Sequence, residues 1–215
     1  MALAALLALT AAAASREGVS EGSLWGITTP VWLWAAVAVA VVHQLWGWLC
    51  WRLELHAQWL SQHFGDAGFH IYAGGFAVLG PSRVLVIIAL AAANQGTLDV
   101  NRSAASVLAT LMLIPVLYLG YSVKLYVGFR RALGADHFDP SYRNLPLVRE
   151  GIFRFTRNGM YTFGFFVVWL PGLCAASQAA LLATAFNHVY IWVHYFATDL
   201  PDMRRIYGRD GVENS

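Results

Sequence analysis

The stretch Pro30–Trp51, PVWLWAAVAVAVVHQLWGWLCW, decides the fold class of this chain. It contains no Asp, Glu, Lys or Arg, and it is long enough to cross a bilayer as a helix, which takes about 20 residues. Tryptophans gather at both ends, where aromatic side chains anchor spanning helices to the interface, and proline suits the first helical turn. We therefore predict a membrane-spanning helix, which can continue as an amphipathic segment through residues 52–64 until Gly65 ends it.

Composition leads to the same conclusion for the whole chain. Hydrophobic residues make up 58% of the 215 residues and charged residues 12%, whereas soluble domains carry about 25% charged residues. So few charges cannot cover a surface that faces water, and much of the exterior must therefore face lipid. The formal net charge of +2 is too small to indicate a nucleic-acid partner. The sequence predicts an integral membrane protein embedded in the lipid bilayer.

Further apolar runs complete the prediction of an all-α, integral membrane helical bundle. A second span centres on residues 84–93, after a less regular, glycine-rich stretch at 69–80, and a third covers residues 104–127. Two shorter runs, at 160–173 and 177–197, form a C-terminal helical hairpin. With the first span, these segments predict four to five transmembrane helices.

The first residues of the chain are harder to interpret. Residues 1–15 are apolar and rich in alanine, but they are shorter than a full span, and no basic residue precedes them as in a secretory signal. An extra helix, a frayed extension and a cleaved leader all stay open, and we favour a helix that lies at the membrane or partly enters it. Residues 1–29 would then form an apolar extension and linker, and residues 30–127 the transmembrane helices.

Arginines concentrate in two segments that flank the hairpin. They are Arg130, Arg131, Arg143, Arg149, Arg154 and Arg157 in the polar segment 128–159, and Arg204, Arg205 and Arg209 in the tail. Cytoplasmic loops carry the excess of Lys and Arg in membrane proteins. We therefore predict that both segments face the cytoplasm, with residues 52–69 on the same side. A bacterial inner membrane and the endoplasmic reticulum both fit.

Neither cysteines nor histidines indicate a metal site or a disulfide. Cys50 and Cys174 lie inside apolar runs, and we interpret both as small hydrophobes that are buried or face lipid. His56, His63 and His70 recur every seven residues, but no carboxylate or cysteine accompanies them at ligand spacing. The prediction is that this chain holds no metal.

The first cluster of candidate functional residues precedes the hairpin, in LVREGIFRFTRNGMYTFG, residues 147–164. Gly151, Gly159 and Gly164 permit close backbone approach or positive φ. Arg154 and Arg157 are suited to hold an anionic group. The alternative is a positive-inside loop without a site, and charge alone does not separate the two interpretations.

The second cluster follows the hairpin, in NHVYIWVHYFATDLPDMRRIYG, residues 187–208. Helical spacing places His188, Trp192, Tyr195 and Asp199 on one face, with His194 on the adjacent stripe. Pro201 should kink or stop the helix near Asp199. An ionisable group in or beside the membrane is energetically costly, so a functional role is the default hypothesis for the Asp199 carboxylate. The competing interpretation is that Asp199 only caps a short following helix, together with Asp202, while Arg204 and Arg205 contact lipid headgroups.

Read together, the two clusters resemble the phospholipid methyltransferases, which share a C-terminal architecture with the isoprenylcysteine carboxyl methyltransferases. The residues in register with the motif that precedes the hairpin are Leu147, Val148, Gly151, Phe153, Arg154, Arg157, Met160, Tyr161 and Gly164. Leu133-Gly134 upstream and Thr198-Asp199-Leu200-Pro201 with Ile206-Tyr207 downstream extend the likeness over residues 131–208. The chain departs from the pattern at Asn158-Gly159, where His-Pro is usual, and its acidic doublet is reduced to Asp199.

The resemblance implies a membrane methyltransferase that binds S-adenosylmethionine in a pocket formed by residues 128–215 and open to the cytoplasm. The cofactor-binding residues that it implies are Gly151, Arg157, Asn158, Gly159, Tyr161, Gly164 and Asp199. Tyr161 is also a catalytic candidate, with its ring against the adenine or the methyl group. For an amine acceptor, His194, Asp199 or a water between them would take the proton that is lost before attack.

The expected acceptor is the headgroup amine of phosphatidylethanolamine or of its methylated forms, and so a membrane lipid. Basic residues of the loop would suit the phosphate beside that amine. Methylation of a prenylated cysteine carboxylate or of a small thiol stays open as an alternative. The second class is a non-enzymatic membrane protein that has lost the activity, which the departures at Asn158-Gly159 and at the acidic doublet would explain.

Overall fold

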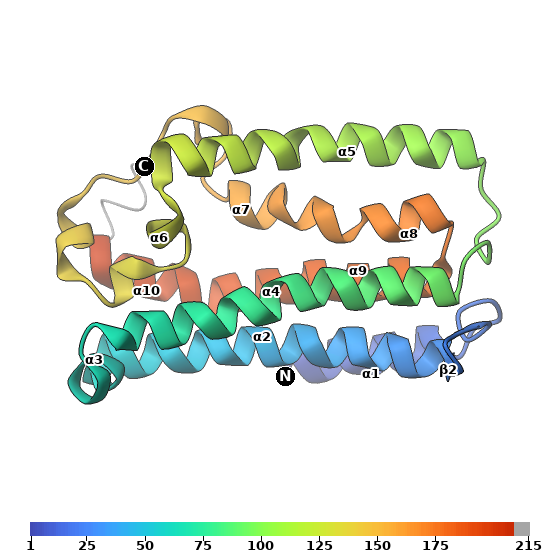
Figure 1. Ribbon diagram of the computed structural model, residues 1–215, viewed down its shortest axis with the longest axis horizontal. Helices are drawn as coiled ribbons and strands as arrows, with labels where there is room; N and C mark the ends of the chain where they lie inside the picture. The colour runs from blue at the N-terminus through green and yellow to red at the C-terminus, as the bar shows by residue number, and fades with distance from the viewer. Residues whose placement is uncertain (209–215) are drawn as a thin grey trace.

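The computed structural model describes residues 1–208, except for the side chains of residues 143 and 144. Arg209 and the rest of the predicted tail therefore lie outside the described residues, as does the side chain of Arg143. The chain forms an elongated bundle whose long helices run side by side (Figure 1). Within residues 1–208, three helices are long and apolar enough to cross a membrane, and the predicted all-α membrane bundle is confirmed.

The first spanning helix is α2, Thr29–Ala57, which contains the predicted span. It ends because Gln58 adopts a left-handed conformation with φ of 50°. A short helix, α3, follows over Trp59–Phe64, and the predicted break comes at Gly65 with φ of 56°. The amphipathic continuation of the first span is therefore divided between the end of α2 and α3.

The second spanning helix, α4, is longer than the sequence indicated. It runs over Ala67–Ala93, so the glycine-rich stretch is regular helix rather than an irregular lead-in. A β-carbon added to Gly75 would overlap the indole of Trp46 on α2. Small residues let helices approach closely in membranes, and packing against α2 therefore overrides the poor helix propensity of glycine here.

The third spanning segment begins with α5, Arg102–Ser122, whose first turn is capped by the Asn101 side chain, with Ala104 N 3.1 Å from Asn101 Oδ1. A π-helical turn, Val123–Val127, extends it until Gly128, with φ of 79°, ends the helix. Short helical pieces then cross one end of the bundle. They are α6 (Phe129–Ala132) and the 3₁₀ turns Ala135–His137, Pro140–Asn144 and Gly151–Arg154.

The predicted hairpin has one irregular and one regular limb. Its first limb consists of α7 (Gly159–Thr162), a 3₁₀ turn (Gly164–Val168) and α8 (Leu170–Ala175). Its second limb is α9, Gln178–His194, whose start is capped by Ser177 Oγ, 3.1 Å from Ala180 N.

Of the two predicted effects of Pro201, a kink or a stop near Asp199, the stop does not occur, because the chain stays helical beyond α9. A π-helical turn, Tyr195–Asp199, leads directly into α10, Leu200–Tyr207. Pro201 lies in the first turn of α10. In a regular helix the amide of residue 201 would donate to the carbonyl of Ala197, which proline cannot do. That carbonyl instead accepts a hydrogen bond from Arg52 Nη2 at 3.2 Å, so a side chain of α2 replaces the missing donor.

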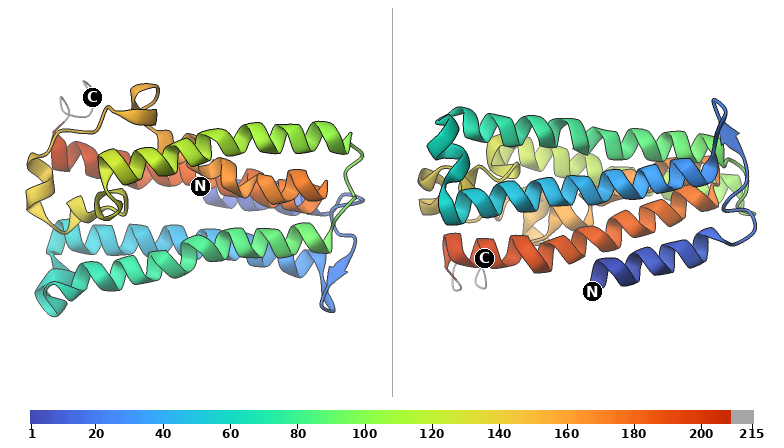
Figure 2. Two further views of the ribbon diagram at one scale, coloured as in Figure 1. Left: turned by 45° about the horizontal axis from the view of Figure 1, so that its top comes forward. Right: turned by 90° about the horizontal axis from the view of Figure 1, so that it is seen from below.

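The N-terminal segment is helical, as we favoured. Helix α1, Ala2–Ala14, lies along α9 (Figure 2, right), and its leucines pack against a cluster that includes Phe186 and Tyr190. A two-stranded hairpin, β1 (Ser23–Leu24) and β2 (Ile27–Thr28), then leads into α2.

The two ends of the bundle differ in character. Helices α3, α6 and α10 gather at one end with the connecting loops, whereas the β-hairpin lies at the other (Figure 1). The polar segments that the arginine pattern assigns to one side of a membrane, residues 52–69, 128–159 and the start of the tail, thus lie at the same end. We call it the loop end.

Candidate active site

A cavity of about 370 Å³ opens at the loop end. Its wall combines Trp51 at the end of α2 with residues drawn from the segments 127–137, 147–149, 153–161 and 195–204. The cavity therefore lies between the polar segment that precedes the hairpin and the helical turns that follow it. Its ionisable wall residues include the cations Arg131, Arg149, Arg157 and Arg204, the histidine His137, and the carboxylates Asp136 and Asp199.

Four of the predicted site residues lie on this wall: Arg157, Asn158, Tyr161 and Asp199. The Tyr161 ring is 5.1 Å from the ring of Tyr195, measured between centroids, and Tyr195 also lines the cavity. The fold thus brings residues from the two sequence clusters together across the hairpin. Their roles toward a ligand stay predictions.

The other predicted residues do not line the cavity. His194 is buried behind Trp51, with the two ring centroids 5.8 Å apart. Gly151 has φ of 61° and packs against Ser122, while Gly164 packs against Leu119, both on α5.

Gly159 lies against Ile152 and Phe153. These glycines do allow positive φ or close approach, but their neighbours are protein side chains. Their assignment to cofactor binding stays an untested prediction.

Asp199 lies in the π-helical turn beyond the end of α9. Such turns are rare and occur frequently at functional sites, and this one brings both Tyr195 and Asp199 to the cavity wall. Burial raises the pKa of the Asp199 carboxyl to about 6, although the charge of His137 and a hydrogen bond from Tyr161 oppose the shift. A carboxyl with this pKa exchanges a proton near neutral pH.

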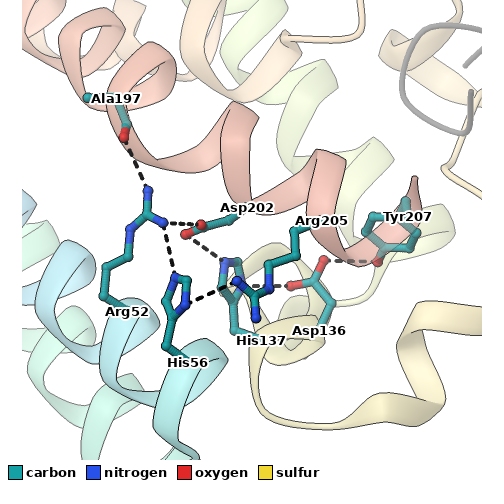
Figure 3. Close-up of polar contacts among 8 residues, drawn as sticks. All are labelled: Arg52, His56, Asp136, His137, Ala197, Asp202, Arg205 and Tyr207. Carbon is teal, nitrogen blue, oxygen red and sulfur yellow. Dashed lines mark hydrogen bonds and ion pairs between the residues drawn. The ribbon is translucent and has the colours of Figure 1, made fainter. Parts of the chain in front are cut away.

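The sequence did not indicate a second set of polar residues, in which Asp136 and His137 lie on the cavity wall and Asp202 contacts His137 from α10. His137 Nδ1 is 3.1 Å from Asp136 Oδ1, and its Nε2 is 3.6 Å from Asp202 Oδ2 (Figure 3). Asp136, His137 and Asp202 are 5%, 2% and 1% exposed, respectively. The imidazole also stacks on Trp51, with ring centroids 4.4 Å apart and planes at 14°. Two carboxylates thus flank one buried imidazole.

The charges in this set are mutually dependent. Burial disfavours the imidazolium, but the hydrogen bond to Asp136, the nearby carboxylate of Asp202 and the other negative charges around it outweigh burial and raise the pKa of His137 to about 9. Burial likewise opposes ionisation of Asp136 and by itself would raise its pKa. The pKa of this carboxyl is nevertheless lowered, because it accepts hydrogen bonds from His137 and Tyr207 and lies near the charges of His137 and Arg131. At neutral pH the pair is an imidazolium and a carboxylate.

Two further contacts tie this set to neighbouring elements. Arg52 Nη1 is 2.9 Å from Asp202 Oδ1, which joins α2 to α10. The Tyr207 hydroxyl donates to Asp136 Oδ2 at 2.9 Å and accepts from Arg131 Nη2 at 3.2 Å. Figure 3 shows Arg52 and Asp202 pointing toward each other, with His137 beyond the carboxylate.

Asp202 corrects one interpretation drawn from the sequence. It does not cap α10 through its side chain, because that helix has no side-chain cap hydrogen bond, and it is buried against Arg52 and His137. Among residues 1–208, no group of three or more His, Cys, Asp or Glu is arranged to hold a metal ion. The set is a hydrogen-bonded and ionic network.

Little in the sequence could have revealed the network. Asp136 and His137 adjoin Leu133-Gly134 in a polar segment, which is a weak signal for a functional loop. Asp202 lies 66 positions beyond Asp136 in the chain, and neither helical nor strand periodicity relates residues so far apart. Their proximity depends on the return of the hairpin to the loop end.

Comparison with known protein families assigns this region. The model of the phospholipid methyltransferase family matches residues 104–210, and it includes every residue named on the cavity wall except Trp51. The resemblance seen in the sequence is therefore confirmed, and it extends upstream into α5. No curated protein and no solved structure matches the chain.

Proposed function

Because this chain belongs, through residues 104–210, to the phospholipid methyltransferase family, we propose that it is an S-adenosylmethionine-dependent methyltransferase of membrane lipids. Its acceptor is the headgroup amine of phosphatidylethanolamine or of its partly methylated forms. The transfer takes place in the cavity at the loop end, and the arginine distribution assigns that end to the cytoplasm.

One observation carries the proposal. The two segments that resemble the family's motif and its acidic segment lie on opposite sides of the hairpin in sequence, yet Arg157, Asn158, Tyr161 and Asp199 line one cavity. Such convergence of charged and aromatic residues in a concave site is typical of a ligand-binding pocket. The cavity also lies within a bundle whose helices can span a membrane, where a lipid acceptor is within reach.

The residues of the wall fit S-adenosylmethionine. An arginine forms charge-assisted hydrogen bonds with a carboxylate, and we assign this role to Arg157. Asp199 would accept hydrogen bonds from ribose hydroxyls or from the amino group, and Tyr161 would lie against the adenine or the methyl group. A cavity of about 370 Å³ is within the usual range for small-ligand sites. When bound, the cofactor supplies a methyl group on a positively charged sulfur, which departs as a neutral thioether.

The chain's own residues would provide alignment and accept a proton. In-line displacement depends mainly on holding the two reactants close and correctly oriented, which the aromatic and cationic wall would do. An ammonium headgroup must lose one proton before its nitrogen lone pair can attack. We assign that proton to Asp199, directly or through a water, because its carboxyl lies on the wall and has a pKa of about 6. His194, the other candidate, is buried behind Trp51.

Incubation of the purified protein with methyl-labelled S-adenosylmethionine and mixed membrane lipids tests the proposal. We expect label in the phosphatidylcholine series. Label only in prenylated protein or in a volatile sulfide would overturn the acceptor and favour a carboxylate or thiol. No binding of the cofactor by calorimetry, in protein that remains folded, would overturn the enzyme itself and favour a membrane protein without the activity.

A further inference from the structure

We propose that Arg131 and Asp136 form the subsite that recognises the zwitterionic headgroup of the lipid acceptor, with Arg131 holding its phosphate and Asp136 its ammonium group. This inference rests on the proposed function. The motif residues were assigned to the cofactor and to proton transfer, and none of them binds the lipid headgroup, so Arg131 and Asp136 supply that contact.

The geometry pairs a cation with a carboxylate at a short, fixed spacing. Both side chains belong to residues on the cavity wall, and both contact one hydroxyl, that of Tyr207, at 3.2 Å for Arg131 and 2.9 Å for Asp136. The guanidinium and the carboxylate are therefore separated by no more than two hydrogen-bond lengths. An ethanolamine phosphate presents a negative and a positive group across only two carbon atoms, so its charges match this spacing.

Arg131 is held in place while donors stay available. The three hydrogen bonds of its guanidinium within residues 1–208 all use Nη2, to the Tyr207 hydroxyl and to the carbonyls of Leu145, at 3.3 Å, and Pro146, at 2.9 Å. Nε and Nη1 have no protein acceptor among those contacts and can donate to a phosphate, the group for which arginine's planar geometry is best suited. An arginine fixed in advance loses less conformational entropy when it binds.

Asp136 is likewise fixed, and it is charged. Its two carboxylate oxygens contact His137 and Tyr207 from opposite sides, and it is 5% exposed. These contacts fix the orientation of the carboxylate at the cavity wall. It also supplies a second acid to the cavity, where the sequence shows only Asp199 in place of the family's acidic doublet.

The two carboxylates come from different parts of the wall. Asp199 belongs to the turn that follows α9, and the cofactor candidates Arg157, Asn158 and Tyr161 come from the start of α7 and the residues before it. Arg131 and Asp136 belong to α6 and the 3₁₀ turn after it. Methyl transfer needs the cofactor and the acceptor in contact. The first group of residues can hold the cofactor, while Arg131 and Asp136 hold the acceptor.

The test compares acceptor and cofactor affinity in the full-length protein reconstituted in lipid nanodiscs. The variants are Asp136→Asn and Arg131→Gln. Their matched controls are Asp99→Asn, in the loop between α4 and α5 at the opposite end of the bundle, and Arg130→Gln. Arg130 neighbours Arg131 in sequence but packs over the Phe69 ring at 4.7 Å instead of lining the cavity. The acceptors are phosphatidylethanolamine and a long-chain primary amine without phosphate.

We expect Asp136→Asn to raise KM for both acceptors at least tenfold, the effect of losing one charge-assisted hydrogen bond. Arg131→Gln should raise KM for phosphatidylethanolamine by a similar factor and leave KM for the simple amine unchanged. In both variants the affinity for S-adenosylmethionine, measured by calorimetry, should stay within about twofold of wild type, since neither side chain is assigned to it. Both controls should match wild type.

Three outcomes would overturn the subsite. Wild-type KM in both variants would show that the pair does not contact the acceptor, and a weakened cofactor affinity with unchanged KM would assign it to the cofactor. If wild-type protein labels neither acceptor, the proposed function fails first and the subsite fails with it. Should Asp136→Asn not fold, Tyr207→Phe removes only the shared hydroxyl and must raise KM for phosphatidylethanolamine.

Discussion

The carboxylate of Asp202 lies 2.9 Å from the guanidinium of Arg52, and this ion pair ties α10 to the end of the first spanning helix. The Asp202 side chain is 1% exposed and that of Arg52 28%. The same arginine also donates to the carbonyl of Ala197, which Pro201 deprives of its helical partner. One side chain of α2 thus holds both the buried acid and the π-helical turn that carries Asp199.

Replacing Arg52 by Met should destabilise the protein. The substitution leaves the buried carboxylate of Asp202 without its closest cation. Removing one partner of a fully buried pair costs about 3–5 kcal/mol, and the partial exposure of Arg52 reduces this loss. We expect the melting temperature in detergent to fall by roughly 5 °C or more. Arg102→Met, an exposed arginine at the opposite end of the bundle, is the control. Equal melting temperatures for the two variants would show that the ion pair adds nothing to stability.

Stability should decrease at alkaline pH because of His137. The pKa of this group is raised from 6.5 to about 9 in the folded protein. Its contribution is therefore fully present below pH about 6.5 and is lost as pH rises through about 9, with a size on the order of 3 kcal/mol. Melting temperatures between pH 6 and 9.5 should fall for wild type and stay nearly flat for His137→Gln. A parallel decrease in both would contradict the assignment.

Turnover should depend on an ionised Asp199. Burial raises the pKa of its carboxyl to about 6, so kcat/KM should decline as pH drops below that value, and Asp199→Asn should lose at least about 100-fold. Because the charge of His137 lowers the pKa of Asp199, His137→Gln should move the acidic limb of the profile to higher pH. Full activity of Asp199→Asn would show that another group takes the proton.

Arg157 should govern cofactor affinity. Removing its guanidinium in Arg157→Ala would eliminate a charge-assisted hydrogen bond to the cofactor carboxylate, and we expect the dissociation constant of S-adenosylmethionine to rise at least about tenfold. Arg154→Ala is the matched control, because Arg154 is exposed and does not line the cavity. Calorimetry on both variants measures the dissociation constant of S-adenosylmethionine. A similar loss in both would point to a general effect of basic charge.

Gly151 should be intolerant of a side chain. Its φ of 61° disfavours other residues, and a β-carbon would overlap Ser122, whose hydroxyl accepts a hydrogen bond from the Ile152 amide at 3.0 Å. Gly128 also has positive φ, 79°, but open space around it. Gly128→Ala should therefore cost about 1 kcal/mol from strain alone, and Gly151→Ala about 2 kcal/mol more. Equal melting temperatures would exclude the overlap at Gly151 as a source of instability.

Much of the fold could be predicted because it depends on local patterns. The span at residues 30–51 follows from its length and lack of charge, and Ser177 and Asn101 begin helices as capping residues do. The failures are also local. The glycine-rich start of α4 appeared irregular because glycine is a poor helix former, and only its close packing on Trp46 explains why it is helical.

The candidate site likewise has residues that the sequence could identify and one whose position it could not. The order of motif, hairpin and acidic segment identified Arg157, Tyr161 and Asp199, and the cavity contains all three. That order could not show that His194 is buried near Trp51 and does not line the cavity. The choice between adjacent stripes of one helix depends on which neighbours pack against it.

By itself the sequence determined that this chain is a helical membrane protein, which ends of its helices are basic, and which family its C-terminal third resembles. Those properties reside in hydrophobic length, charge distribution and residue order, and none of them needs a folded chain. Only the tertiary structure decided that Asp136, His137 and Asp202 meet, and that Asp199 is not the sole acid of the cavity. The physical reason is that partners from three separate elements stabilise this buried ionic network: α2, the loop that follows α6, and α10. These elements meet only when the hairpin returns to the loop end, and no periodicity along the chain encodes such contacts.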